Sequence, residues 1–203
     1  MKIQSIIFDL GGVLLNIDYH RTIKAFKLLG IKESNDFYSK KHQHNLFNLL
    51  ETGNISEPEF LSKMHDLSNC SDKDAIIKAW NSLILELPQN RISMLNNLKK
   101  SFNLYLLSNT NSIHIDYIKN KLGKEKYNNF YSIFNKVYYS HKIGVRKPNP
   151  KAFELILEEQ NLTPNKTLFI DDSKQHIIAA KRLGIISHHL KHNVTKLFPD
   201  IIQ

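Results

Sequence analysis

Short apolar runs alternate along the chain with longer segments whose apolar positions are spaced three and four residues apart. The runs lie at 5–8, 104–107, 136–139, 167–170 and 185–190, and the spaced segments lie at 88–100, 112–122, 150–160 and 173–183. The spacing predicts helices, and the short runs bounded by polar residues predict buried strands. Buried strands that alternate with helices are typical of a parallel sheet. The pattern therefore predicts an α/β fold with a Rossmann-like parallel sheet.

Residues 17–86 follow a different pattern, with four helical segments and no convincing strand. Helices are expected at 19–29, 36–50, 56–67 and 71–85. The third begins at Ser56-Glu57-Pro58-Glu59, a capping box with proline in the first turn. A helical segment inserted at one strand–loop junction is typical of a lid. We therefore expect residues 1–16 and 87–203 to form the α/β core and residues 17–86 to form a small four-helix cap.

Polar residues of distinctive type follow the predicted strands. They are Asp9, Ser108, Asn109, Lys147, Asp171 and Asp172. The carboxyl ends of parallel strands meet at one edge of a sheet, where such folds bind ligands. A single Asp after a strand is often a helix N-cap, but this ordered set is poorly explained in that way. Three crowded carboxylates repel one another, and a divalent cation with oxygen ligands, above all Mg²⁺, would relieve the repulsion.

Charge and composition narrow the classes of partner. The chain carries 28 basic and 19 acidic residues, a net charge of +9, which attracts anions such as phosphorylated metabolites. Arginines are few and lysines are scattered, so we expect no nucleic-acid partner. No apolar run approaches the roughly 20 residues that span a bilayer, so no membrane partner is expected either. Cys70 is the only cysteine, which excludes an intrachain disulfide and favours a reducing, cytoplasmic location.

Four segments at the strand ends resemble the motifs of the haloacid dehalogenase-like hydrolase superfamily. They are FDLGGVL at 8–14, LLSNTN at 106–111, GVRKP at 144–148 and FIDDS at 169–173. The order and spacing of the motifs also match, and the helical insertion follows the first motif, as in that superfamily. The resemblance is nearest to small phosphatases that open with Asp-Leu-Gly, some of which act on sugar phosphates. It implies a phosphoric monoester hydrolase.

The resemblance implies a covalent mechanism with a metal ion. Asp9 would be the nucleophile and would form an aspartyl-phosphate. Mg²⁺ would bind the other Asp9 oxygen, the backbone carbonyl of Gly11 and the Asp172 carboxylate. Asp171 would be a further ligand or would hold a metal-bound water.

The resemblance also implies which residues bind the substrate. The Ser108 hydroxyl and the Asn109 amide would contact the phosphate oxygens, and Lys147 would neutralise charge on the nucleophile and the transferring group. The segment 51–56 resembles the turn of the cap that selects the substrate, and it makes Glu51 a candidate substrate contact. The expected partner is therefore a small phosphorylated metabolite, for example a sugar phosphate.

Gly11 departs from the superfamily pattern, because phosphatases typically carry there the Asp that serves as general acid and base. Loss of such a group usually lowers the rate by about 10²–10⁴. Asp18 could replace it, although an N-cap of the first cap helix is the simpler interpretation. Two alternatives to a Mg²⁺-dependent phosphatase therefore stay open. One is a metal-independent 2-haloacid dehalogenase, and the other is a catalytically weakened ligand-binding or regulatory protein.

Overall fold

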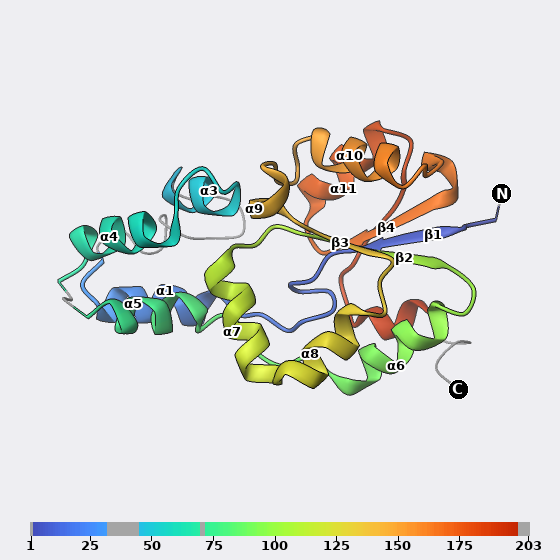
Figure 1. Ribbon diagram of the computed structural model, residues 1–203. Helices are drawn as coiled ribbons and strands as arrows, with labels where there is room; N and C mark the ends of the chain where they lie inside the picture. The colour runs from blue at the N-terminus through green and yellow to red at the C-terminus, as the bar shows by residue number, and fades with distance from the viewer. Residues whose placement is uncertain (1, 32–44, 70–71, 199–203) are drawn as a thin grey trace.

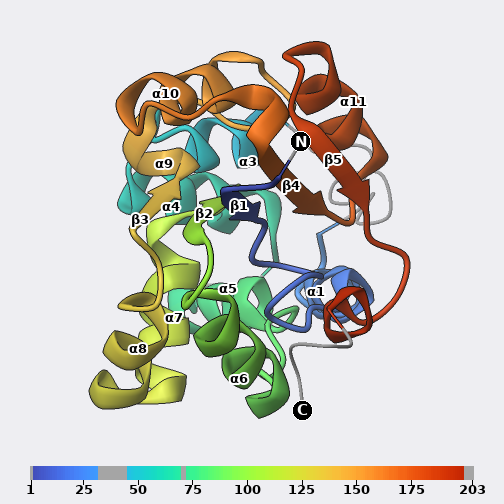
Figure 2. The same cartoon turned by 90° about the vertical axis from the view of Figure 1, so that its right-hand side faces the viewer.

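The computed structural model describes residues 2–31, 45–69 and 72–198 and contains one parallel sheet (Figures 1 and 2). The strands are β1 (Ser5–Phe8), β2 (Asn103–Ser108), β3 (Lys136–Tyr139), β4 (Thr167–Asp171) and β5 (Ile186–His189). Their order is β3-β2-β1-β4-β5, and every neighbouring pair is parallel. Phe8 at the end of β1 pairs with Leu106 and Ile170, so the first strand is the centre of the sheet. The α/β fold expected from the sequence is confirmed.

Helices cover both faces of the sheet. In Figure 1, α10 (Lys151–Glu159) and α11 (Lys174–Arg182) lie above it, and α6 (Gln89–Leu98), α7 (Ser112–Leu122) and α8 (Lys124–Tyr131) lie below. Successive residues of a strand point to opposite faces of the sheet. Ile7 therefore packs in the hydrophobic cluster on one face, while Ile6 and Phe8 pack in the cluster on the other. Fully buried strands of this kind need apolar side chains on both faces, which explains the continuous apolar runs.

Most helix bounds agree with the sequence pattern, but two helices were missed. One is α8, in which Phe130 is buried and Tyr127 and Tyr131 pack partly buried against the core, so its packing face is short and stands among polar residues. The other is the short helix α9 (Ser140–Ile143), which follows β3 and ends at Gly144 in the left-handed conformation. The final strand and the helix at 112–122 match the expectation to within two residues.

The helices described in 17–86 lie together beyond the carboxyl ends of the strands (Figure 1). They are α1 (Tyr19–Leu28), α3 (Asn45–Glu51), α4 (Glu57–Leu67) and α5 (Lys73–Asn81), and α4 begins with the expected capping box. Four aromatic residues of these helices contact one another, and Trp80 stacks on Phe47 at 4.7 Å between ring centroids and on Phe26 at 5.9 Å. They belong to the same buried cluster as one face of the sheet, so these helices pack against the core as well as against one another.

Two antiparallel segments connect these helices to the sheet. The Asn16 amide donates to the Glu86 carbonyl at 2.9 Å, the Leu85 amide donates to the Asn16 carbonyl at 3.0 Å, and the Asp18 amide donates to the Leu83 carbonyl at 2.9 Å. The chain therefore leaves and re-enters the core at one place. We propose a core of 1–16 and 87–203 and a cap of 17–86, divided at this paired segment.

Some expectations fall outside the described residues. The first part of the helix expected at 36–50 and the cysteine at position 70 belong to this group. Among the residues that the structure describes, no helix combines the length and apolar character needed to cross a membrane.

Candidate active site

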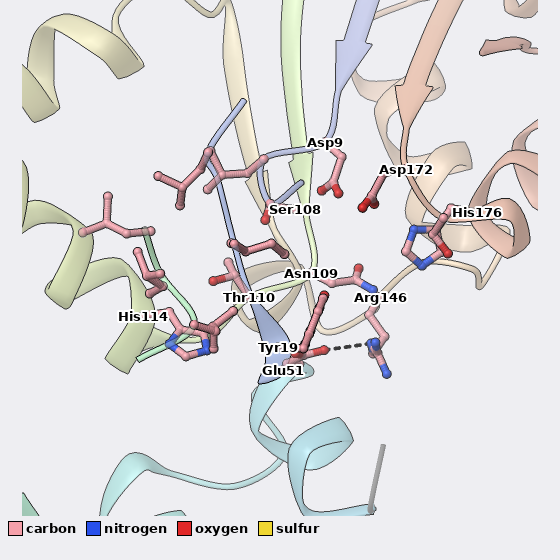
Figure 3. Close-up of a pocket in the computed structure, with 18 of the residues that line it drawn as sticks. Asp9, Tyr19, Glu51, Ser108, Asn109, Thr110, His114, Arg146, Asp172 and His176 are labelled. Atoms are coloured by element: carbon pink, nitrogen blue, oxygen red, sulfur yellow. Dashed lines mark ion pairs between the residues drawn. The ribbon is translucent and has the colours of Figure 1, made fainter. Parts of the chain in front are cut away.

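A cavity of about 90 Å³ lies at the carboxyl ends of the central strands (Figure 3). One part of its wall is polar and includes Asp9, Ser108 and Asp172 from the core. Another part is apolar and includes Ile84 and Ile118. The convergence expected from the order of the strands therefore brings several of the candidate residues to one cavity.

Asp9 follows β1 directly and ion-pairs with Lys147. Its amide donates to the Ile170 carbonyl of β4 at 3.0 Å, which fixes the backbone at the centre of the sheet. Its Oδ1 lies 2.9 Å from Lys147 Nζ. Burial raises the pKa of Asp9 to about 7, although the nearby ammonium of Lys147 acts to lower it. A positive charge that binds here therefore favours the ionised, nucleophilic form of Asp9.

Lys147 is fully buried between two carboxylates. Its Nζ also lies 2.7 Å from Asp171 Oδ2 and donates to the Leu107 carbonyl at 2.8 Å. Burial alone would lower the pKa of Lys147, but the carboxylates of Asp171 and Asp9 outweigh it and raise the pKa. The side chain is therefore a fixed cation next to Asp9.

Asp171 is surrounded by protein donors. Besides Lys147, it accepts from the Ser173 amide at 2.7 Å and lies 3.0 Å from His176 Nδ1. Burial would raise its pKa, but Lys147 and His176 outweigh this effect and hold the pKa well below its usual range. The carboxylate is thus ionised, and its contacts suit a residue that positions Lys147 and His176.

Asp172 faces the cavity and lies opposite Asp9 in Figure 3. One carboxylate oxygen from each of Asp9, Asp171 and Asp172 lies within 4.8 Å of the others. Oxygen atoms so grouped fit a hard divalent cation such as Mg²⁺. Asp172 also lies close to the backbone of Gly12, and a Cβ built on Gly12 would lie 2.3 Å from Asp172 Oδ2. The backbone of Gly12 is in the left-handed region, with φ +78°. Position 12 therefore requires glycine both for its conformation and for the lack of space.

Ser108 and Asn109 differ in what they contact. Ser108 is the last residue of β2, and its side chain lies between Asp9 and Asn109 in Figure 3. The side-chain nitrogen of Asn109 donates to the backbone carbonyl of Lys147 at 2.8 Å, and its side-chain oxygen accepts from the backbone N–H of Lys147 at 2.9 Å. These contacts hold the loop of Lys147, and the expected phosphate contact of Asn109 stays a prediction. We propose that Asn109 is a positioning residue.

The cap reaches the cavity through Glu51. Its Oε2 lies 3.0 Å from Arg146 Nε of the core loop, and the Arg146 side chain also donates to Asn48 (Figure 3). Tyr19, the first residue of α1, lies beside Glu51. Burial raises the pKa of the Tyr19 phenol, and the carboxylates of Asp172, Glu51 and Asp9 raise it further, so the phenol stays protonated. Two cap residues thus offer polar groups to a ligand.

Asp18 lies outside this set of cavity residues. Its side chain accepts from the His20 amide at 3.0 Å, which makes it the N-cap of α1. Gly11 lines the cavity with no side chain, and among the described residues that line it, none is an Asp at the acid/base position of the superfamily pattern. The N-cap interpretation of Asp18 is therefore confirmed.

The sequence reasoning missed several residues of the cavity wall, among them Tyr19, His114, Arg146 and His176. Arg146 lies within the segment 144–148, and His114 and His176 each follow a motif segment by three residues, which was the available signal. Tyr19 carried no such signal, because an aromatic residue at the start of an amphipathic helix is usually a core residue.

Comparisons with known proteins agree with this geometry. The model of the haloacid dehalogenase-like hydrolases matches residues 3–184. The chain is 31% identical over 183 residues to a D-ribitol-5-phosphate phosphatase of Bacteroides thetaiotaomicron, covering 90% of this chain and 89% of that protein.

Two solved structures differ in how similar their sequences and folds are to this chain. A wild-type HAD family enzyme of Bacteroides thetaiotaomicron, crystallised with magnesium and inorganic phosphate, has 30% identity and a TM-score of 0.83 over 97% of this chain and 99% of that one. The L-2-haloacid dehalogenase of Xanthobacter autotrophicus has 17% identity and a TM-score of 0.61, over 91% of this chain and 76% of that one. The second likeness shows a shared fold alone.

Proposed function

Because the chain belongs to the haloacid dehalogenase-like hydrolase family, we propose that it is a Mg²⁺-dependent phosphatase of a small phosphorylated metabolite. The observation that carries this proposal is the buried Asp9 carboxylate, which lies 2.9 Å from Lys147 Nζ and within 4.8 Å of the carboxylates of Asp171 and Asp172. A nucleophilic carboxylate beside a fixed cation and a metal-ligating group is what transfer of a phosphoryl group to the protein requires.

The reaction uses Asp9 twice. In the first step an Asp9 oxygen forms a bond to phosphorus while the ester bond breaks, and the departing alkoxide takes up a proton from solvent water. In the second step a water oxygen forms a bond to phosphorus and gives up a proton to solvent, the bond to Asp9 breaks, and phosphate is released. Lys147 neutralises charge on Asp9 and on the transferring group in both steps, while Ser108 contacts the phosphate oxygens.

The metal-ligating role belongs to Asp9, Asp172 and the Gly11 carbonyl. Mg²⁺ bound there supplies the positive charge that lets an anionic phosphate approach three carboxylates. The contacts of Asp171 with Lys147, His176 and the Ser173 amide support a role in holding its neighbours. The magnesium and phosphate crystallised with the similar enzyme of Bacteroides thetaiotaomicron support a magnesium and phosphate site in this chain.

The proposed substrate is a sugar or sugar-alcohol phosphate. The cavity of about 90 Å³ is far smaller than the roughly 300–1,000 Å³ of pockets that take larger ligands, which favours a short leaving group. Glu51, Tyr19 and Arg146 offer hydrogen-bonding groups that suit hydroxyls. The activity of the 31% identical relative on ribitol 5-phosphate supports this class.

The test is a panel of phosphate esters measured with and without Mg²⁺. It should include sugar phosphates, polyol phosphates, nucleotides and p-nitrophenyl phosphate, with 2-chloropropionate as a halide-release control. We expect Mg²⁺-dependent release of phosphate, strongest on small sugar or polyol phosphates and abolished by EDTA. Halide release that persists in EDTA would instead establish the dehalogenase, and inactivity on every ester would favour the regulatory alternative.

A further inference from the structure

His114 lines the cavity at some distance from the charged residues. It lies in the first turn of α7, where its amide donates to the side chain of Asn111, the N-cap, at 3.0 Å. Figure 3 places its ring on the opposite side of the cavity from Arg146 and His176. The residue belongs to the core, and the proposed function gives it no role.

The cap fixes the orientation of the His114 ring. Nδ1 lies 2.9 Å from Asn81 Oδ1, and the ring stacks on Trp80 with 4.5 Å between centroids and 23° between planes. Asn81 and Trp80 are the last residues of α5, and both are buried. One ring edge is therefore held by the cap, which leaves the other edge in a defined position.

These contacts determine which nitrogen carries the proton. An amide oxygen only accepts hydrogen bonds, so His114 Nδ1 must be the donor to Asn81. Burial lowers the pKa of His114 to about 3, so the imidazole is neutral at physiological pH. A neutral ring protonated at Nδ1 carries its lone pair on Nε2. Nε2 is therefore a hydrogen-bond acceptor.

Nε2 lacks a hydrogen-bond partner within the described part of the protein. The atom is buried, and it makes no hydrogen bond to any residue that the structure describes. Leu83, Ile84 and Ile118, which also line the cavity, have side chains that offer no donor. The hydroxyl groups that line it, among them that of Thr110, make no hydrogen bond to Nε2. Buried polar atoms are nearly always satisfied in native proteins, so an orphaned acceptor on a residue that lines the cavity points to a donor on the ligand.

We propose that His114 is a specificity-determining residue whose Nε2 accepts a hydrogen bond from a hydroxyl group on the alcohol part of the substrate. The inference rests on the proposed phosphatase function and narrows its substrate class. The leaving group carries at least one further hydroxyl, and its C–H surface packs against the apolar wall at Ile84 and Ile118. A polyol or sugar chain meets both requirements, whereas a simple alkyl or aryl alcohol leaves Nε2 unsatisfied.

The first test compares two esters of equal chain length, D-ribitol 5-phosphate and n-pentyl phosphate. His114→Asn keeps a polar atom near the position of Nδ1 and removes Nε2, whereas His114→Gln extends an amide toward the position of Nε2. We expect His114→Asn to lower the preference for the ribitol ester, as the ratio of the two kcat/KM values, by about 10- to 100-fold, mainly through KM. His114→Gln should restore part of the preference. His65→Asn, a change to a half-exposed histidine on α4, should leave it unaltered.

The outcomes separate the inference from the proposed function. A folded His114→Asn protein with unaltered preference would refute the inference, and so would a wild type that hydrolyses both esters equally well. A wild type inactive on every ester of the panel would refute the proposed function and, with it, a substrate contact of His114. Thermal melting of each variant excludes loss of folding as the cause.

The second test needs no turnover. In ¹⁵N spectra of the imidazole rings, His114 should be neutral and protonated at Nδ1 from pH 5 to 9. Addition of D-ribitol 5-phosphate to the Asp9→Asn variant with Mg²⁺ should shift the Nε2 resonance, whereas n-pentyl phosphate should not. A ring protonated at Nε2, or equal shifts with both esters, would overturn the inference even if His114→Asn failed to fold.

Discussion

The absent acid/base group can be restored by the substitution Gly11→Asp. Gly11 lines the cavity next to Asp9, and its φ lies outside the left-handed region, so its backbone accepts a side chain. Gly12 offers the opposite case, since its φ of +78° and the contact of 2.3 Å that a Cβ would make with Asp172 exclude a side chain. Position 11 is therefore the one of the two at which a carboxylate can be added.

The structure sets the steric cost of this change. A Cβ at position 11 would lie 3.1 Å from Ile17 Cδ1, the flexible end of a side chain that must move by a few tenths of an ångström. Overpacking of a core costs about 1–3 kcal/mol, and this contact belongs at the lower end because it involves a single methyl group. A loss of about 1 kcal/mol lowers Tm by roughly 2–4 °C in a domain of this size. Gly11→Ala makes the same contact without a carboxylate and is the matched control.

The catalytic gain follows from proton transfer to the leaving group. General acid/base catalysis contributes about 10²–10⁴ in rate, and the neighbouring carboxylates would raise the pKa of the added Asp, which suits a proton donor. We expect Gly11→Asp to accelerate hydrolysis of esters with poorly acidic leaving groups and to have little effect on p-nitrophenyl phosphate. A plot of log kcat/KM against leaving-group pKa should be steep in the wild type and flatter in Gly11→Asp.

The comparison with Gly11→Ala shows whether the added carboxylate transfers a proton to the leaving group. If Gly11→Asp folds, binds Mg²⁺ and keeps the slope of the wild type, the leaving group already receives its proton from another donor. If Gly11→Ala flattens the slope as much as Gly11→Asp, the change comes from altered packing at Ile17. Either result would contradict an acid/base role for the added carboxylate.

Two further predictions concern the carboxylates at the strand ends. Asp9→Asn should reduce turnover to background in a folded protein, and mass spectrometry should detect phosphorylation of the wild type alone; turnover by an intact Asp9→Asn variant would refute the covalent mechanism. Asp172→Ala should raise the Mg²⁺ concentration needed for half-maximal activity. Asp171→Ala should instead lower Tm by roughly 6–20 °C, because loss of one partner from a buried ion pair costs about 3–5 kcal/mol; equal effects of the two changes in both assays would contradict the different roles.

The fold was predictable because its signals are local. The central strand β1 is a short apolar run that is buried on both faces, and the capping box of Ser56 and Glu59 marks the start of α4. The strand ends could be placed at one edge because all strand pairs of this sheet are parallel. The helix α8 escaped prediction because its packing face consists of Tyr127, Phe130 and Tyr131, which stand among polar residues and form too short a pattern to indicate a helix.

The site was predictable as a set of residues but not as a set of contacts. The adjacent carboxylates of Asp171 and Asp172 look equivalent in sequence, yet consecutive residues at a strand end point in different directions. One of them meets Lys147 and His176, and the other faces the cavity. The environment of His114 depends on Trp80 and Asn81, which lie more than 30 positions away, and no local pattern reports such a contact.

The ion pair between Glu51 and Arg146 leads to a final prediction about the cap. It joins a cap side chain that is 5% exposed to a core side chain that is 21% exposed, so each change removes a charged partner from a largely buried side chain. Glu51→Ala and Arg146→Ala should each lower kcat/KM on a sugar phosphate, because each loosens the contact that holds the cap over the cavity. The relative loss on p-nitrophenyl phosphate should be smaller, since that ester needs fewer contacts with the cap.

A double-mutant cycle measures whether the two residues act together. Residues in direct contact usually show interaction energies of about 0.5–3 kcal/mol, and here the double variant should lose little more activity than the more damaged single variant. Additive losses in folded proteins would mean that Glu51 and Arg146 contact the substrate separately. Non-additive losses confined to sugar phosphates would instead mean that the ion pair acts as a unit, so that the cap turn at 51–56 selects substrates only while Arg146 of the core holds it over the cavity.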